Sequence, residues 1–172
     1  MHGRRRTGST FGNLKVFDNA LREGADPSST LIGRARGLGV FASLDNSGGV
    51  TTIEFVFSNY GNYSGSTLAT LGHLAFPGSE RSIVGGTGVL RFARGYFTTE
   101  IISSTSDYLV ALIDIDAGAA DDKLTHLQFY LHEVPSSAPN ATTVKVAGLN
   151  VYVTANTELL WHRHKMLSFT HY

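Results

Sequence analysis

The chain has 172 residues, of which 42% are hydrophobic and 16% charged, and its formal net charge is zero. This composition is typical of one globular domain with a sizeable core, and it excludes a disordered chain. Balanced charge gives no general attraction to nucleic acid or to a membrane surface, and no apolar run is long enough for a transmembrane helix, so neither partner is expected. The sequence contains no cysteine, which excludes disulfides and thiolate metal sites.

The first ten residues carry a basic run, Arg4 to Arg6. We expect this segment to be a solvated, disordered tail, and a nucleic-acid patch is the less favoured alternative. No apolar stretch comes after the positive charges, so we expect no signal peptide in this chain. Two interpretations stay open, a cytosolic protein and a secreted one whose export segment is missing here.

Short apolar or alternating runs come next, separated by steps rich in Gly, Ser, Asn and Asp. In chain order the expected strands are Leu14–Leu21, Thr30–Leu44, Val50–Ser58, Ser66–Ala75, Val89–Ile102, Tyr108–Asp116, Leu124–Val134 and Thr142–Thr154. Eight strands with tight connections predict an all-β fold, an antiparallel meander closed as a barrel or folded as a sandwich. We place a single domain at residues 11–154 and a second tail at 155–172.

Two of these strands have a face that mixes aromatic and charged side chains. Alternate residues of a strand share a face, and the two sets are Leu127, Phe129, Leu131 and Glu133, and Leu90, Phe92, Arg94 and Tyr96. A carboxylate and a guanidinium among aromatic rings are typical of a ligand cavity. An ion pair at a barrel mouth, or an exposed Glu133 at a strand end, is the alternative. The candidates for contacting a ligand are Phe92, Tyr96, Phe129 and His132.

Three segments resemble the plant dirigent family: STLIGRARGL (29–38), YSGSTLATLG (63–72) and VGGTGVLRFARGY (84–96). The resemblance covers roughly residues 11–116. It implies an eight-stranded antiparallel closed β-barrel of the dirigent and allene-oxide-cyclase type.

The order of the segments then departs from the family. KLTHLQFYLHEV (123–134) and PNATTVKVAG (139–148) resemble the opening strand of a dirigent protein and the segment after it, yet here they come last. First and last strands are neighbours in the family's barrel, so a linker at 117–122 would join them as a hairpin. New chain ends would then lie near Phe11 and Thr154. A true permutation, a truncated tandem array and a mis-assembled gene model all stay open.

The resemblance implies a function without a cofactor. Dirigent proteins do not oxidise their substrates, because a separate oxidase, a laccase or peroxidase, makes phenoxy radicals from monolignols such as coniferyl alcohol. The barrel then imposes stereoselectivity on their coupling to lignans. The family also implies a homotrimer in the apoplast. Two alternatives are a non-catalytic binding barrel of the grass dirigent–jacalin type, acting in defence, and an inactive gene fragment.

The family's motifs also imply site residues. Glu133, in the step His132-Glu133, takes the place of an aspartate, and Tyr63 and Arg94 match the tyrosine and arginine of two motifs. Asp18 matches an acidic position after the family's second strand. These four residues are the catalytic candidates. Lignan-forming members often carry an aspartate where Gly88 stands, so one acid is missing from this chain.

Other motifs are less specific. Asn62-Tyr63-Ser64 and Asn140-Ala141-Thr142 are glycosylation sequons, and we expect Asn140 to be the better acceptor in a secreted protein. The glycine-rich run from Gly85 to Gly88 precedes an expected strand, not a helix, and no lysine follows it. We therefore do not expect it to bind phosphate. The tail holds His162, His164 and His171 without a recognisable ligand spacing, so no metal is expected.

Overall fold

Nine β-strands and two 3-10 helices form the described part of the chain, residues 10–74, 80–118, 124–135, 138 and 140–147 of a computed structural model. The strands are β1 (Leu14–Arg22), β2 (Leu31–Val40), β3 (Gly49–Phe57), β4 (Thr67–Leu74), β5 (Arg81–Gly86), β6 (Arg94–Ser104), β7 (Leu109–Gly118), β8 (Leu124–Glu133) and β9 (Thr143–Ala147). The helices are η1 (Gly61–Tyr63) and η2 (Gly88–Leu90). The helices of this part of the chain are too short to cross a membrane.

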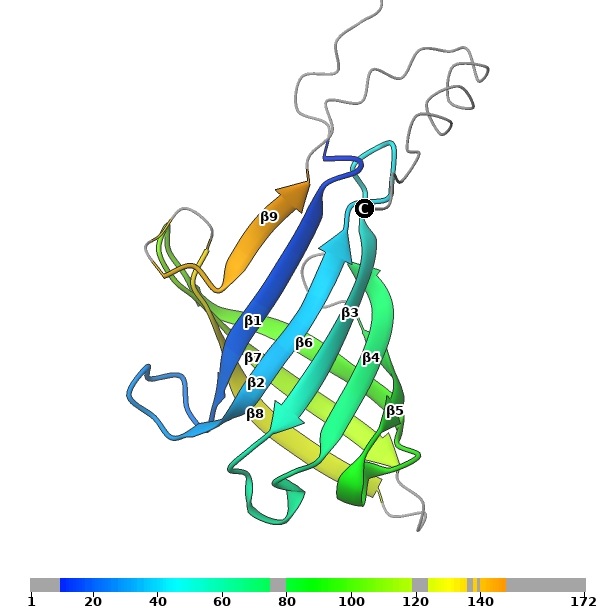
Figure 1. Ribbon diagram of the computed structural model, residues 1–172, viewed down its shortest axis with the longest axis vertical. Coiled ribbons are helices and arrows are strands. Elements are labelled where there is room, and N and C mark those ends of the chain that lie inside the picture. Colours follow the sequence, from blue (N-terminus) through cyan, green and yellow to red (C-terminus); the bar gives the residue numbers. More distant parts are fainter. Residues whose placement is uncertain (1–9, 75–79, 119–123, 136–137, 139, 148–172) are drawn as a thin grey trace, which may run out of the picture. The chain divides into compact units, whose positions relative to one another are not determined.

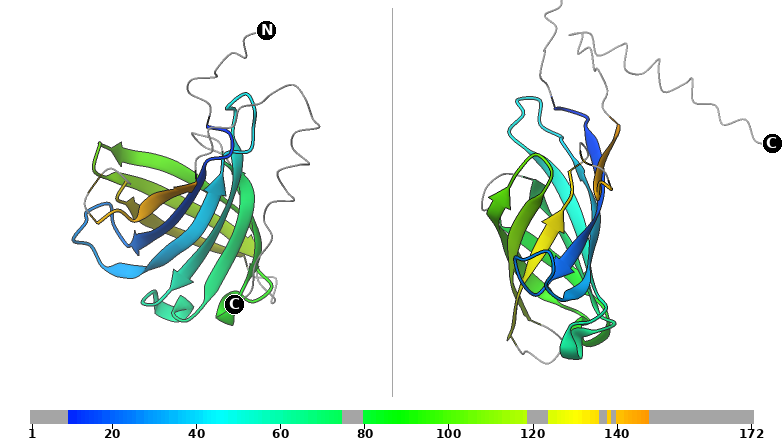
Figure 2. Two further views of the ribbon diagram at one scale, coloured as in Figure 1. Left: turned by 45° about the horizontal axis from the view of Figure 1, so that its top comes forward. Right: turned by 90° about the vertical axis from the view of Figure 1, so that its left-hand side faces the viewer.

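The strands β1 to β8 form a closed barrel (Figure 1). Each strand pairs antiparallel with the next along the chain, and β8 pairs back to β1, with Leu131 opposite Leu21. In Figure 1 and the left view of Figure 2 the strands β1 to β4 cross in front of β6 to β8, as the tilt of strands in a barrel requires. The predicted eight-stranded antiparallel barrel is confirmed.

The strand that is displaced in the sequence closes this barrel. β8 pairs with β7 along its whole length, from Gly118 opposite Leu124 to Leu109 opposite Glu133. It also pairs with β1, and β9 continues along the same edge of β1, with Thr143 opposite Phe17. The predicted hairpin therefore puts the segment 124–133 between the last and first strands of the family body.

A buried polar contact fixes the step between β8 and β9. The Thr142 hydroxyl donates a hydrogen bond to Oδ1 of Asn19 at 2.6 Å and accepts one from the backbone N–H of Val134 at 2.9 Å. Asn19 is 2% exposed. An unpaired amide at this buried position would cost free energy, so the hydrogen bond of Asn19 stabilises the connection between β8 and β9 next to β1.

Two sequence-based strand assignments were wrong. The segment 81–86, which we treated as a connection, is strand β5, and the predicted strand Val89–Ile102 begins only at Arg94. Gly88 and Phe92 have positive φ angles of 61° and 64°, which an extended strand does not allow. A Cβ atom at Gly88 would lie 2.4 Å from Oγ of Ser66, so this turn also needs glycine for space.

The tails at 1–9 and 148–172, including the histidines of the C-terminal tail and the last residues of the strand predicted at 142–154, lie outside the described residues.

Candidate ligand-binding site inside the barrel

An aromatic cluster fills one end of the barrel interior. Phe55 lies edge-on to Phe97 and Phe129, with ring centroids 5.4 and 5.5 Å apart, and Phe57 lies edge-on to Phe129 at 5.6 Å. These four phenylalanines are at most 1% exposed. Tyr60 stacks on Phe57, and its hydroxyl donates to the carbonyl oxygen of Gln128 across the barrel at 3.3 Å. Together these rings form the floor of the interior.

The opposite end is lined differently. Side chains that face the interior there keep partial exposure: Phe17 on β1, Thr99 and Ile101 on β6, and Glu133 on β8. Their partners across the ladder include small residues, such as Gly37 opposite Phe17 and Ala111 opposite Ile101. The side chains at this end are therefore less buried than those of the floor, and we call it the open end.

A buried guanidinium lies between the floor and the open end. Arg81, at the start of β5, is 7% exposed, and its cross-strand partner is Phe97 of the floor. Its Cζ atom lies 5.4 Å from the Phe97 ring centroid. Nε donates to the carbonyl oxygen of His73 at 3.3 Å, and Nη1 donates to the hydroxyl of Thr99 at 3.5 Å. Burial lowers the pKa of Arg81.

The structure does not bring the predicted catalytic residues together. Glu133 is half-buried on the interior face of β8, at the open end. Arg94 is exposed near the other end, where the ladder runs from Arg94 through Gly118 to Leu124. Nine residues of β8 separate that level from Glu133, about 30 Å at ~3.3 Å per residue. Arg94 instead donates from Nη1 to the carbonyl oxygen of Ala93 at 2.8 Å.

The other two catalytic candidates lie elsewhere. Tyr63, in η1, packs against the hydrophobic cluster, with its ring 5.8 Å from that of Tyr60, so it belongs to the floor. Asp18 is on the outer wall, where its carboxylate pairs with Arg34 at 2.8 Å and Arg36 at 3.6 Å. Glu133 is therefore the one predicted acid that faces the interior.

The four candidates for ligand contact are also divided. Phe129 faces the interior but is fully buried in the floor. Phe92 is 70% exposed beyond η2, so the expected face shared by Leu90, Phe92 and Arg94 does not form. Tyr96 is on the outer wall, where its hydroxyl donates to Asp116 at 3.0 Å. His132 faces outward from β8. The sequon residues Asn62 and Asn140 are both exposed.

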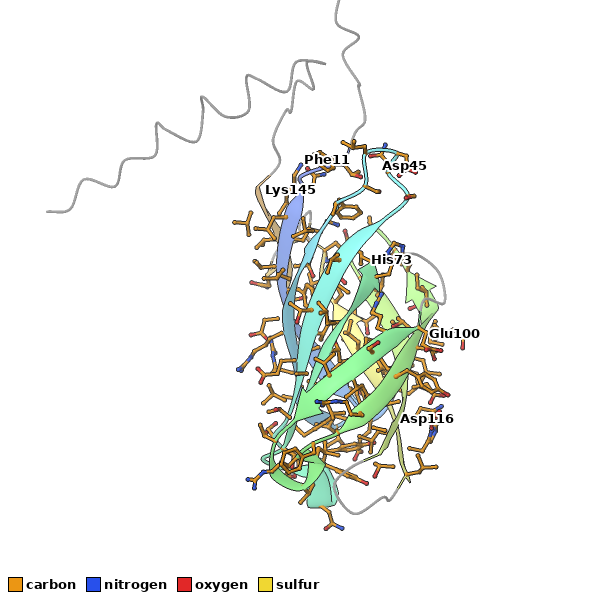
Figure 3. All side chains as sticks on the ribbon, turned by 90° about the vertical axis from the view of Figure 1, so that its right-hand side faces the viewer. Phe11, Asp45, His73, Glu100, Asp116 and Lys145 are labelled. Atoms are coloured by element: carbon orange, nitrogen blue, oxygen red, sulfur yellow. The ribbon has the colours of Figure 1, made fainter. Side chains whose placement is uncertain are left out.

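The outer wall carries a second polar cluster, to which Asp116 in Figure 3 belongs. Nδ1 of His126 lies 3.0 Å from a carboxylate oxygen of Asp116 and 3.5 Å from one of Asp114. Among the described residues these three side chains could offer ligand atoms to one metal ion. The hydrogen bond to Asp116 raises the pKa of His126, and the charge of Asp114 acts in the same direction.

His132 is only 6% exposed, although it points away from the interior. Its Nε2 lies 3.0 Å from the carbonyl oxygen of Gly24. A carbonyl oxygen only accepts, so Nε2 carries the proton, and Nδ1 accepts from the hydroxyl of Tyr108. The neutral imidazole is therefore satisfied on both sides. Burial lowers its pKa, and the charge of Arg22 acts in the same direction.

We expect His132 to make the barrel less stable in acid. Its pKa is lower in the folded state than in the unfolded chain, so the unfolded chain takes up the proton first as the pH falls. The stability is therefore fully present above the reference pKa of 6.5 and is lost as the pH falls below it. Urea unfolding across this range measures the effect, and His132→Leu removes this pH dependence.

His126→Gln is the matched control, because the raised pKa of His126 has the opposite sign. Its contribution to stability is present below pH 6.5 and is lost as the pH rises above it. If the pH profile of His132→Leu runs parallel to that of the wild type, the assignment is wrong.

Sequence reasoning missed Arg81. The signal was present, since Arg81 and Ile83 alternate with Ser82 and Val84 in the run before Gly85. The segment with Arg81 lies between Pro77-Gly78 and Gly85-Gly86, and such steps indicate a connection. Its arginine is therefore not assigned to the inner or outer face of a strand.

Known proteins resemble this chain in sequence and in fold. The sequence model of the dirigent-like protein family matches residues 2–117. Pterocarpan synthase 1 of Glycine max is 31% identical over 118 residues, which are 67% of this chain and 63% of that protein. Dirigent protein 23 of Arabidopsis thaliana is 42% identical over 88 residues, 50% of this chain and 46% of that protein. The chain thus spans less than two thirds of the length of these relatives.

The fold gives the same result. The solved structure of the pterocarpan synthase dirigent protein GePTS1 superposes with a TM-score of 0.52 and 28% identity, covering 71% of this chain and 68% of that one. The family match ends at residue 117, and β8, which begins at Leu124, lies beyond it. From these matches and the closed barrel, the chain belongs to the dirigent family.

Proposed function

We propose that the barrel binds phenoxy radicals or quinone methides of monolignols and controls the stereochemistry of their coupling to lignans, without oxidising them. The observation that carries this proposal is the interior of the barrel. Above the buried aromatic floor, the partly exposed side chains of Phe17 and Ile101, a buried guanidinium and a carboxylate combine apolar surface with a few polar groups, as sites for aromatic ligands do.

The first contribution of the barrel is orientation. A separate oxidase removes one electron and one proton from each phenol, and the two radicals then form one carbon–carbon bond. Two radicals held in a fixed relative geometry present one pair of faces to each other, so one stereoisomer forms in excess. The edge-on packing of Phe55, Phe57, Phe97 and Phe129 would hold the strands around such a site in place.

The second contribution is proton transfer. The coupled product is a quinone methide, whose ring oxygen gains a proton as a side-chain hydroxyl attacks its electrophilic carbon and loses one. Glu133 faces the interior and is accessible from the open end, so we assign it the role of carrying this proton.

Chiral chromatography tests the proposal. The protein is incubated with coniferyl alcohol and other monolignols, with a laccase as the source of radicals, and the coupling products are separated by handedness. We expect an excess of one enantiomer over the oxidase alone. Racemic products from every monolignol would refute the proposal, and binding without selectivity would favour a non-catalytic binding barrel.

The pterocarpan synthases among the relatives favour a second candidate, a step on a preformed quinone methide that needs no oxidase. Supplying quinone methides directly separates the two candidates. Selectivity in this reaction, together with racemic products in the radical reaction, would favour the second.

The proposal includes assembly as a homotrimer. The outer wall of β9 and β1 to β4 carries a row of exposed apolar side chains: Val144 (43%), Leu38 (40%), Val50 (48%) and Leu71 (50%). Such a row is typical of an interface. We expect light scattering to give about three times the chain mass of 18.5 kDa, and the pair Leu38→Glu and Leu71→Glu to give monomers. A monomeric wild type would contradict this.

The proposal also includes export to the apoplast with a glycan at Asn140. Asn140 is exposed in the turn between β8 and β9, with a positive φ of 62°. Expression of the full transcript in plant cells tests both points. A shift in mobility after glycosidase treatment, lost in Asn140→Gln, is the expected result, and retention in the cytosol would overturn it.

A further inference from the structure

Arg81 is a buried cation that forms no ion pair with the other described residues. The ion pairs found among the described residues join Asp18 to Arg34 and Arg36, and His126 to Asp114 and Asp116, and none includes Arg81. Two of its five N–H donors meet neutral oxygen atoms, both at 3.3 Å or more. Burial disfavours a charge that has no ion-pair partner, so the site favours an anion.

The position of Arg81 fits a ligand that enters from the open end. Its guanidinium is supported below by the Phe97 ring and bonds to Thr99, which is itself partly exposed. Gly72 lies beside Arg81 on the neighbouring strand β4. A Cβ atom at Gly72 would lie 3.0 Å from Cβ of Arg81, so glycine leaves room for the arginine side chain. Lys15 on β1, across the ladder from Gly39, adds a second positive charge toward the open end.

The charge of the ligand follows from ordinary pKa values. A phenol has a pKa of about 10 and is neutral near pH 7, whereas a carboxylic acid has a pKa of about 4 and is ionised. The planar guanidinium matches a carboxylate with two parallel hydrogen bonds. A neutral monolignol would leave the charge of Arg81 uncompensated.

We propose that Arg81 and Thr99 form a carboxylate-binding site, and that this barrel takes an aromatic acid of the phenylpropanoid class in preference to the corresponding alcohol. The inference rests on the proposed function in taking phenylpropanoids as the ligand class. Its aromatic ring would lie against the ring-lined interior, and its carboxylate would neutralise the guanidinium. Arg81 then determines which oxidation level of the side chain binds.

Calorimetric titration with two probes tests this site. The probes are 4-hydroxy-3-methoxycinnamate and coniferyl alcohol, which share the ring and differ at the end of the side chain. We expect the wild type to bind the carboxylate at least about tenfold tighter than the alcohol. Arg81→Met should weaken the carboxylate by about 10- to 100-fold, the range for a charge-assisted hydrogen bond, and leave the alcohol nearly unchanged.

Two further variants sharpen the test. Arg91→Met removes an exposed arginine beyond η2 and should change neither affinity. Arg81→Lys keeps the charge but loses the planar fork, so it should fall between the wild type and Arg81→Met. If Arg81→Met does not fold, the wild type and Arg81→Lys still decide. A wild type without preference for the carboxylate, or an Arg81→Lys with wild-type affinity for both probes, overturns the proposal.

The outcome is independent of the coupling assay. Racemic coupling with Arg81-dependent binding of the carboxylate would refute the proposed function and support the binding site. Selective coupling of monolignols, with Arg81→Met binding both probes as the wild type does, would do the opposite.

Discussion

Phe129→Ala is expected to destabilise the barrel by about 3–5 kcal/mol, the range for removing a buried phenylalanine from a packed core. Phe129 is fully buried and lies edge-on to Phe55, Phe57 and Tyr60, so the substitution removes three ring contacts along with the buried area. The floor has residues from β3, η1 and β8, and the cavity would lie where these elements meet. Closure around it would need several strands to move together.

Urea unfolding followed by circular dichroism, at one protein concentration, measures this loss. Phe92→Ala is the matched control, because Phe92 is 70% exposed, and we expect it to change the free energy of unfolding by less than about 0.5 kcal/mol. Phe129→Leu keeps more of the volume and should cost less than Phe129→Ala. Equal losses for Phe129→Ala and Phe92→Ala would show that the floor does not support the barrel.

Strand alternation was sufficient to predict the face of β8. Leu127, Phe129, Leu131 and Glu133 share one face because side chains two apart point the same way, and the ladder puts that face inside. The same rule failed at the start of β6. There Phe92, a residue with no preference for positive φ, adopts it between η2 and Arg94, and no local pattern in the sequence signals such a conformation.

Strand alternation also does not tell where a residue lies along the axis of the barrel. Arg94 and Glu133 are grouped in the sequence because each shares a strand face with aromatic side chains, yet the register of the strands puts them near opposite ends. That separation depends on the register of two ladders, β6–β7 and β7–β8, and strand alternation alone does not fix either register. The interior face instead holds Glu133, which the sequence indicated, and Arg81, which it did not.

Glu133→Gln is expected to abolish most of the stereoselectivity of the closure step, in which the coupled quinone methide gains its new carbon–oxygen bond. General acid–base catalysis contributes about 100-fold or more to a proton-transfer step. If Glu133 carries the proton when the quinone methide is attacked, its loss slows that step while escape of the intermediate into water keeps its rate. Closure then occurs mostly in solution. The carbon–carbon stereocentres set by orientation persist, but the diastereomeric excess at the new carbon–oxygen centre should approach that of closure without the protein.

Glu100→Gln is the control for Glu133→Gln, since Glu100 is an exposed carboxylate on the outer wall of β6 (Figure 3). It should retain wild-type selectivity. Glu133→Asp keeps the carboxylate with a shorter reach and should recover part of the excess. A merely structural role of the side-chain oxygen would not explain this recovery. The two amide variants are compared with the same laccase, the same coniferyl alcohol and the same radical flux. Wild-type selectivity in Glu133→Gln would remove Glu133 from the mechanism and leave orientation by the barrel wall as the source of any stereocontrol.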